Sequence, residues 1–388
     1  MDLCLTPEQE QIRDSVRKLC APFDASYWLE KDRTGKFPHE FHAAIAAAGW
    51  LGIAMPQEYG GSGLGITEAA LMMQAIAESG AAMSGASAVH MNIFGLQPVV
   101  VFGSDEQKRR MLPPLIAGKD KACFAVTEPD AGLETKAIKL RAAREDDHYV
   151  LSGQKIWIST AQVANKMLVL ARTTPIDQLK RRTEGLTLFY TDLDRTRVSI
   201  RAIEKMGRHA VDSNELFFDR MRVPVADRIG AEGDGFRLIL HGMNPERILI
   251  AAEAVGIGRA ALHSAARYAR ERRVFRRRIG ENQAIAHPLA QAWASLEAAN
   301  LMMLKAAALY DARRDCGIEA NAAKYLAAEA AFHACETAVM THGGMGYSKE
   351  FHVERYLREV MIARIAPITP HMILNFIAEK ALGLPRSY

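Results

Sequence analysis

A block of short β-branched and aromatic runs, residues 122–222, interrupts a chain that is otherwise patterned as amphipathic helices. Turn-forming pairs such as Asp146-Asp147 and Ser152-Gly153 divide these runs, and no interval between them has the pattern of a crossover helix. Parallel strands need such crossovers, so the block favours an antiparallel sheet or small barrel. The predicted strands cover residues 123–127, 149–151, 155–159, 167–171, 186–190 and 216–218.

Helical patterns flank this block on both sides. Before it, alanine-rich stretches at 41–48 and 66–79 are separated by the glycine-rich segment 60–63. After it, Asn244-Pro245 predicts an N-cap and first-turn proline of a helix running towards Phe275, and further helices are expected at 282–312, 319–343 and 369–382. We predict an α+β fold with an N-terminal all-α domain (1–120), a middle antiparallel β domain (121–230) and a C-terminal four-helix-bundle-like domain (231–388).

Charge and cysteine content narrow the functional classes. The net charge is only +4 and 24% of residues are charged, so the composition indicates no nucleic-acid partner. Seven arginines lie between Arg267 and Arg278. They predict a solvated helix end, and a narrower interpretation is that one or two of their guanidinium groups hold a phosphate. The five cysteines form no CxxC pair or Cys/His cluster, which predicts a reducing compartment and no metal site.

The start of the chain predicts a helix and no signal peptide. Thr6-Pro7-Glu8-Gln9 supplies an N-cap, a first-turn proline and a capping-box partner. The apolar run 43–55 is too short to cross a bilayer. We therefore expect a cytoplasmic protein without a membrane span.

One glycine motif has the residue spacing of a dinucleotide-binding fingerprint but not its structural context. Gly256, Gly258 and Ala261 follow the GxGxxA spacing, but they lie inside a helical pattern and not at a strand-to-helix turn. Close packing between helices is the better interpretation of these glycines.

Two strand segments carry the groups needed to hold a planar heterocycle. Phe124, Val126 and Thr127 lead into a tight turn that ends at Gly132, and a second segment carries Trp157 and Ser159. Each segment alone is also compatible with plain sheet. Together they provide a flat aromatic wall with hydrogen-bonding groups beside it.

These two segments, in this order within a helix–sheet–helix chain, resemble the flavin-binding signatures of the acyl-CoA dehydrogenase family. The resemblance covers essentially the whole chain. Further motifs that match in order are Trp50-Leu51-Gly52-Ile53, Pro56-Gln57-Glu58-Tyr59-Gly60-Gly61, Met206-Gly207-Arg208, Gly233-Asp234-Gly235-Phe236, Glu271-Arg272 with Phe275, and His342-Gly343-Gly344-Met345-Gly346-Tyr347.

The resemblance implies FAD as the cofactor. The residues expected to border its isoalloxazine ring are Phe124, Val126, Thr127, Trp157 and Ser159, with Gly132 and Leu133 near the turn that approaches the pyrophosphate. Thr369 and His371 are also expected to contact the flavin.

The family also shares its flavin across a subunit boundary. The matching positions in this chain are Arg272, Phe275, Gln283, Gly343 and Gly344, and the resemblance assigns a phosphate to Arg272. It implies a homo-oligomer, either a tetramer built as a pair of dimers or a dimer. Two positions depart from the family pattern, because Arg276 replaces a glycine and Met340 replaces a frequent glutamine.

The catalytic base is the residue on which the resemblance is most informative. Many family members carry a glutamate just before the last helix, where this chain has Pro367, which cannot accept a proton. Isovaleryl-type and long-chain-type relatives instead carry the glutamate just before an arginine on an earlier helix, which matches Glu246 and Arg247. The resemblance thus implies Glu246 as the base and a substrate-binding segment formed by Met243, Asn244 and Arg247.

The implied activity is α,β-dehydrogenation of an acyl-CoA thioester to a trans-2-enoyl-CoA, with electrons passed to an electron-transfer flavoprotein. Two rivals remain on the same scaffold. One is a flavin-dependent monooxygenase, which would lack the glutamate base, and the other is a non-catalytic partner subunit. Should Glu246 not be the base, His371 and Glu253 are the next candidates.

Overall fold

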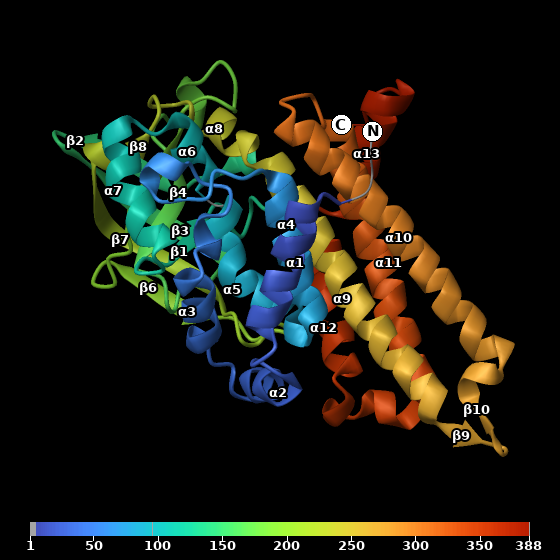
Figure 1. Ribbon diagram of the computed structural model, residues 1–388. Helices are drawn as coiled ribbons and strands as arrows, with labels where there is room; N and C mark the ends of the chain where they lie inside the picture. The colour runs from blue at the N-terminus through green and yellow to red at the C-terminus, as the bar shows by residue number, and fades with distance from the viewer. Residues whose placement is uncertain (1–4, 95, 388) are drawn as a thin grey trace.

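The chain folds into three consecutive parts, an N-terminal helical part, a sheet and a C-terminal helical bundle, as Figure 1 shows. The computed structural model describes residues 5–94 and 96–387. The N-terminal part is helical, and its helices are α1 (Pro7–Cys20), α2 (Ala25–Thr34), α3 (His39–Ala47), α4 (Ile66–Ile76), α5 (Ala82–Phe94), α6 (Gln97–Phe102) and α7 (Asp105–Ile116).

The predicted start of α1 is confirmed. The Thr6 hydroxyl accepts a hydrogen bond from the Gln9 amide at 3.2 Å, and the Gln9 side chain accepts one from the Thr6 amide at 3.1 Å. This capping box satisfies two amides that a helix start otherwise leaves unpaired.

The middle part is an eight-stranded sheet with the order β6-β7-β3-β2-β4-β5-β8, in which β1 pairs with β4. The bounds are β1 (Ala122–Ala125), β2 (Arg141–Glu145), β3 (His148–Ser159), β4 (Lys166–Arg172), β5 (Leu186–Asp192), β6 (Val198–Ala202), β7 (Ser213–Pro224) and β8 (Arg228–Ile229). Most pairings are antiparallel, as the sequence predicted.

Two details of the sheet differ from the prediction. Ser152-Gly153 is not a turn but a bulge within β3, because the pairing with β7 shifts register between Leu151 and Gly153. Strand β1 runs parallel to β4, and the connection between them contains the β2–β3 hairpin in place of a crossover helix.

The C-terminal part is a helical bundle. Its elements are α8 (Gly235–His241), α9 (Met243–Glu271), the hairpin strands β9 (Arg273–Val274) and β10 (Arg277–Arg278), α10 (Gln283–Asp311), α11 (Gly317–His342), α12 (Val353–Ile365) and α13 (Pro370–Leu382). Helix α12 was not predicted. Gly242, and not Asn244, is the N-cap of α9, so Asn244 and Pro245 lie in its first turn.

Close helix packing explains the glycines of the apparent dinucleotide motif. A Cβ atom at Gly256 would lie 2.4 Å from the Gln74 carbonyl oxygen on α4, and one at Gly258 would lie 2.8 Å from a methyl group of Leu296 on α10. Both glycines lie inside α9, where they allow neighbouring helices to approach.

Two helical stretches, Ile66–Phe102 and Gly235–Glu271, are long and apolar enough by length and composition to cross a membrane. Within the protein, 75% and 78% of their most apolar windows are buried. Their apolar faces supply much of the core between the N-terminal helices and the bundle.

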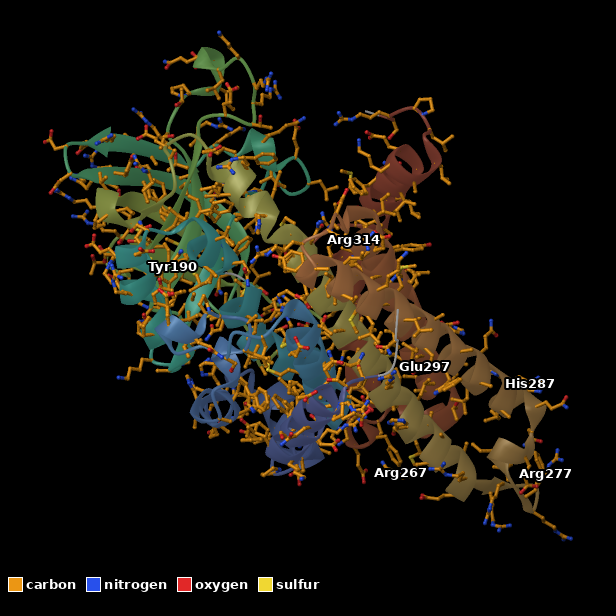
Figure 2. All side chains as sticks on the ribbon, turned by 45° about the horizontal axis from the view of Figure 1, so that its top comes forward. Tyr190, Arg267, Arg277, His287, Glu297 and Arg314 are labelled. Carbon is orange, nitrogen blue, oxygen red and sulfur yellow. The ribbon has the colours of Figure 1, made fainter. Side chains whose placement is uncertain are left out.

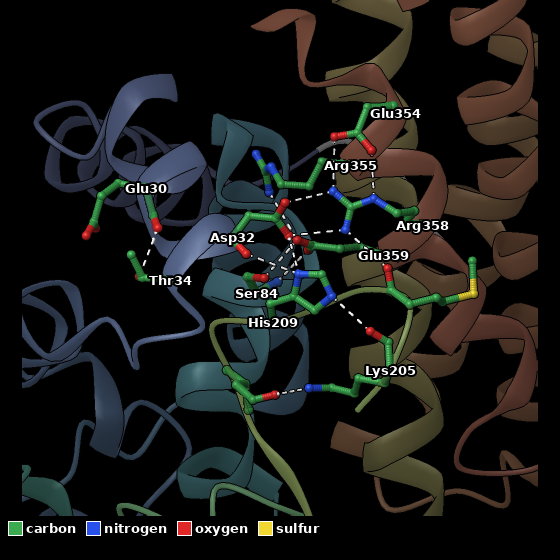
Figure 3. A network of polar contacts seen from close by, with 12 residues as sticks. Glu30, Asp32, Thr34, Ser84, Lys205, His209, Glu354, Arg355, Arg358 and Glu359 are labelled. Atoms are coloured by element: carbon green, nitrogen blue, oxygen red, sulfur yellow. Dashed lines mark hydrogen bonds and ion pairs between the residues drawn. The ribbon is translucent and has the colours of Figure 1, made fainter. Parts of the chain in front are cut away.

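A buried ionic network joins the three parts of the chain, and we call it the Asp32 clamp. Asp32 on α2 accepts hydrogen bonds from both terminal nitrogens of Arg358 on α12, at 2.8 and 3.2 Å. His209 in the β domain contacts the same carboxylate at 3.1 Å, and Arg358 also donates to the Met206 carbonyl at 3.1 Å. Figure 3 shows Asp32 between Arg358 and His209.

We expect Asp32→Asn to lower the free energy of unfolding by roughly 1.5–3 kcal/mol, the range for a hydrogen bond to a charged group, because Arg358 loses the Asp32 carboxylate and keeps only that of Glu354 at 2.7 Å. Urea titration of both proteins at neutral pH measures the difference. The exposed pair Lys380–Glu379 provides the control, since Glu379→Gln should leave the urea midpoint nearly unchanged.

The loss should also depend on pH. Burial raises the pKa of Asp32, but the hydrogen bonds and charge of Arg358 lower it by more, so the net pKa lies below the ordinary value. The stabilisation is therefore present above the unfolded-state pKa of about 3.9 and is lost as the pH falls through the lower folded-state value. Equal stabilities of wild type and variant at neutral pH would contradict this account.

Candidate active site

The predicted aromatic wall forms where β1 ends beside a bulge in β3. The Ile156 amide donates to the Thr127 carbonyl at 2.9 Å, which joins the two segments. The pairing of β3 with β7 shifts register between Lys155 and Ile158, and Trp157 adopts a φ of 61° there. The bulge turns the Trp157 indole outwards, so that 56% of the residue is exposed.

The other predicted wall residues lie around this indole. Val126 is buried at the end of the β1 segment, whereas Phe124, Thr127 and Ser159 are partly buried. Gly132 and Leu133 lie in the exposed turn that follows, and no atom lies within 4 Å of a Cβ built at Gly132. This open turn suits close approach of a ligand to the backbone.

A buried ion pair, which sequence analysis missed, fixes the turn after β1. The Lys155 ammonium donates to the Val126 carbonyl at 2.8 Å and to the Glu128 carboxylate at 2.9 Å. Glu128 also accepts the amides of Lys139 and Leu140 at 2.7 and 2.9 Å. Burial lowers the pKa of Lys155 to about 8, although Glu128 opposes that change.

A second missed residue, Arg208, lies behind the wall. Its guanidinium donates to the hydroxyls of Ser159 at 3.0 Å, Ser87 at 3.1 Å and Ser213 at 3.4 Å. Since Arg208 occupies an acceptor site of Ser159, the Ser159 proton is left to donate elsewhere. The Met206-Gly207-Arg208 motif was the one sequence signal that pointed to this position.

The Glu246 segment occupies the first turn of α9. Glu246 is half-buried, and its Oε2 atom is buried without a hydrogen-bond partner among the described residues. Arg247 donates to the Asn244 side chain at 3.0 Å, and its Nε atom is likewise buried and unpaired among the described residues. Met243 is partly buried one position before Asn244.

Burial raises the pKa of Glu246 to about 7, while the charges of His90, Arg247 and Lys324 act in the opposite direction. A carboxylate with this pKa exchanges a proton near neutral pH, which is the property required of a general base.

The loop that holds Pro367 lies close to this segment. The Lys324 ammonium donates to the Ile368 carbonyl at 2.7 Å and to the Arg364 carbonyl at 3.4 Å, which anchors the loop between α12 and α13. Thr369 caps α13 and is partly buried, whereas His371 is exposed on its first turn. These two residues therefore lie beside the Glu246 segment and not in the β domain.

The remaining predicted cofactor residues form a separate group at the far tip of the bundle. A groove of about 780 Å³ there is lined by residues that include Arg272, Phe275, Gly343 and Gly344, and Gln283 is exposed at the start of α10. Figure 2 shows Arg267 and Arg277 at this tip, far from Tyr190 in the β domain. Within one chain, helix α5 contacts both β1 of the wall and α9, which carries Glu246, whereas the Arg272 group lies apart from them.

Three family models match this chain in order. They are the N-terminal domain of acyl-CoA dehydrogenase over residues 6–119, the middle domain over 123–221 and the C-terminal domain over 233–382. Acyl-CoA dehydrogenase FadE12 of Mycobacterium tuberculosis is 39% identical over 386 residues, which covers 98% of this chain and 97% of the relative.

The chain belongs to the acyl-CoA dehydrogenase family. The predicted fold class and oxidoreductase class are therefore confirmed. Another relative is the CarC subunit of a caffeyl-CoA reductase–Etf complex from Acetobacterium woodii, which is 33% identical over 340 residues, with 87% of this chain and 88% of the relative covered.

A solved neighbour supports the fit of FAD to the wall. The FAD complex of PigA has a TM-score of 0.93 and 27% identity, and the alignment covers 99% of this chain and 100% of that one. The exposed Trp157 indole, the hydroxyls of Thr127 and Ser159 and the open turn at Gly132 match the flat ring, polar edge and phosphates of such a cofactor.

We expect Lys155→Met to weaken FAD binding by at least about tenfold, because Glu128 would lose its cation and the turn after β1 would lose its anchor. Flavin retained after dialysis, measured by absorbance, gives the readout. Lys139→Met is the matched control, because the Lys139 ammonium is exposed and its ion pair with exposed Asp130, at 3.4 Å, is a surface pair of little energetic weight. Equal flavin contents in the two variants would show that the buried pair does not shape the wall.

Proposed function

We propose that this protein is an FAD-dependent acyl-CoA dehydrogenase that forms a trans-2-enoyl-CoA and uses Glu246 as its base. The carrying observation is the buried, unpaired Oε2 atom of Glu246, whose carboxyl group titrates near neutral pH. Pro367 supports the same assignment, because the alternative base position holds no ionisable group.

The chemistry required of this chain is removal of one proton. Glu246 accepts the proton from Cα of the thioester, and the electron pair left behind forms the double bond as Cβ loses a hydride. When bound, FAD supplies the acceptor for that hydride. Ser159 and Thr127 would hold the polar edge of the FAD ring, and Arg247 holds the first turn of α9 in place through Asn244.

An electron-transfer flavoprotein is the proposed acceptor of the electrons. The similarity to the CarC subunit, which works in a complex with such a protein, supports this partner. We also propose a cytoplasmic location, because Cys20, Cys123, Cys316 and Cys335 are all unpaired.

Two alternatives make different predictions for the same experiment. A flavin-dependent monooxygenase or a non-catalytic partner subunit would leave its flavin oxidised when an acyl-CoA is added without oxygen. The proposed dehydrogenase should bleach its flavin under those conditions, and a panel of thioesters would identify the preferred acyl group.

Glu246→Gln should keep FAD and acyl-CoA binding but slow anaerobic flavin reduction by roughly 10²–10⁴-fold, the usual contribution of a positioned base. Stopped-flow absorbance measures this rate. The control is Glu297→Gln. Glu297 is a bundle carboxylate outside the site, and it accepts a hydrogen bond from Arg259 at 2.7 Å. An unchanged rate in Glu246→Gln would direct attention to His371, since Glu253 is already paired with His90.

The rate of flavin reduction in the wild-type protein should rise with pH and reach half of its maximum near 7. The reason is that only the ionised carboxylate of Glu246 accepts a proton, and its pKa is about 7. A rate that falls as pH rises through this range would argue against a carboxylate base.

We also propose a homotetramer built as a pair of dimers. The Arg272 group and the aromatic wall lie at opposite ends of one chain, so one flavin can contact both only across two subunits. The bundle tip also exposes 94% of Phe275 and 90% of Tyr347, an apolar surface that suits a subunit contact.

Arg272→Ala should lower FAD affinity by roughly 1.5–3 kcal/mol, the range for a hydrogen bond to a charged group. Fluorescence titration of the apoprotein with FAD measures it, and exposed Arg201 provides an Arg201→Ala control. A stable monomer that keeps its flavin at full affinity would contradict the shared site.

A further inference from the structure

A buried histidine–glutamate pair lies outside the groups used so far. His90 Nδ1 on α5 and Glu253 Oε1 on α9 are 2.5 Å apart, and the two residues are 7% and 0% exposed. The second carboxylate oxygen of Glu253 has no hydrogen-bond partner among the described residues. An isolated buried charge is costly, so each member of such a pair depends on the other.

The pair lies between the aromatic wall and Glu246. Ser87, one turn before His90 on α5, accepts a hydrogen bond from Arg208, and Arg208 also donates to Ser159 of the wall. Glu246 and Glu253 are seven residues apart on α9, so they lie on one face about 10 Å apart along the axis. Helix α5 thus places His90 beside the face of α9 that carries both carboxylates.

The charges that act on these groups come from several elements. Glu246 is influenced by His90 on α5, by Arg247 and Glu253 on α9 and by Lys324 on α11, with His90 the strongest of these. His90 is influenced by Glu253, Glu246 and Arg208. Burial lowers the pKa of His90, but the Glu253 carboxylate raises it by more, so the net pKa lies above the usual value.

The other two cations lower the pKa of Glu246 by less than His90 does. Arg247 is bonded to Asn244, and the Lys324 ammonium is directed to the carbonyls of Ile368 and Arg364. Burial also lowers the pKa of Lys324 to about 8, so it loses charge just above the range in which Glu246 titrates.

We propose that His90, held by Glu253, is a positioning residue for the base: its imidazolium charge keeps the Glu246 carboxylate ionised in a site shielded from water. This inference rests on the proposed function, because it assigns His90 a role through Glu246. The role is electrostatic and requires no bond between His90 and the substrate. Glu253 keeps the imidazole protonated and fixes its ring, so Glu253 acts through His90.

The test measures protonation of Glu246 directly and does not require turnover. Infrared difference spectra of the FAD-loaded protein, recorded as the pH is changed, follow the C=O stretch of protonated carboxyl groups. The band that Glu246→Gln removes belongs to Glu246. We would record the same titration for His90→Gln, which keeps a donor towards Glu253 but carries no charge, and for Glu253→Gln.

Glu253→Gln weakens the charge on His90 but also removes a carboxylate that itself raises the pKa of Glu246, so it should change that pKa less than His90→Gln does. His90→Gln should raise the pKa of Glu246 above the wild-type value of about 7, because it removes the nearby positive charge. Anaerobic flavin reduction at about pH 6 should then be slowed about tenfold or more, while at about pH 9 it should recover to within about twofold of the wild-type rate. Recovery at high pH separates an electrostatic role from a packing defect, which pH would not repair.

Ser84→Ala is the matched control, because it removes a buried hydrogen bond of α5, that to Glu359 at 2.8 Å, without changing the charge beside Glu246. It should leave the Glu246 band and the pH profile in place. An unchanged Glu246 titration in His90→Gln would overturn the inference. Failure of every acyl-CoA to bleach the wild-type flavin would instead count against the proposed function, and the infrared result would still decide the role of His90.

Discussion

The Asp32 clamp is the interaction on which the arrangement of the three domains depends. Asp32 on α2, Arg358 on α12 and His209 in the β domain meet at one buried carboxylate. The aromatic wall belongs to the β domain, whereas Glu246 belongs to the bundle, so their relative position is only as well defined as the contact between these domains. The hydrogen bonds of a buried charge pair attract the two groups and also fix their relative orientation, whereas apolar packing is not directional.

Buried charged groups with defined partners also occur at the candidate active site. Lys155 with Glu128, Arg208 with three serine hydroxyls and His90 with Glu253 are each charged groups held away from water by defined partners. Because most of these contacts join elements that are distant in sequence, the charges also fix how strand, loop and helix meet. The site is thus assembled from polar contacts inside an otherwise apolar junction, and Glu246 and Glu253 each keep one carboxylate oxygen without a partner within the described residues.

The sequence predicted the order of the domains, the main strands and the long helices, because apolar periodicity and turn residues are local signals. It missed α12, whose buried face carries Arg355 and Glu359, both 1% exposed, so the apolar pattern is broken where the helix packs. It also missed the roles of Lys155 and Arg208, since their partners lie 27 and 49 residues away along the chain. The Glu246 segment was located by resemblance, and its burial needed the folded structure.

The distance between the partners of the Asp32 clamp has a consequence for synthesis. Asp32 and Arg358 are separated by 326 residues, so nearly the whole chain must leave the ribosome before the pair can form. Until then the N-terminal helices carry a carboxylate that is buried in the native protein and whose counter-ion does not yet exist. The helices therefore gain their final position only when α12 arrives, and the last part of the chain to be made completes the docking of the first.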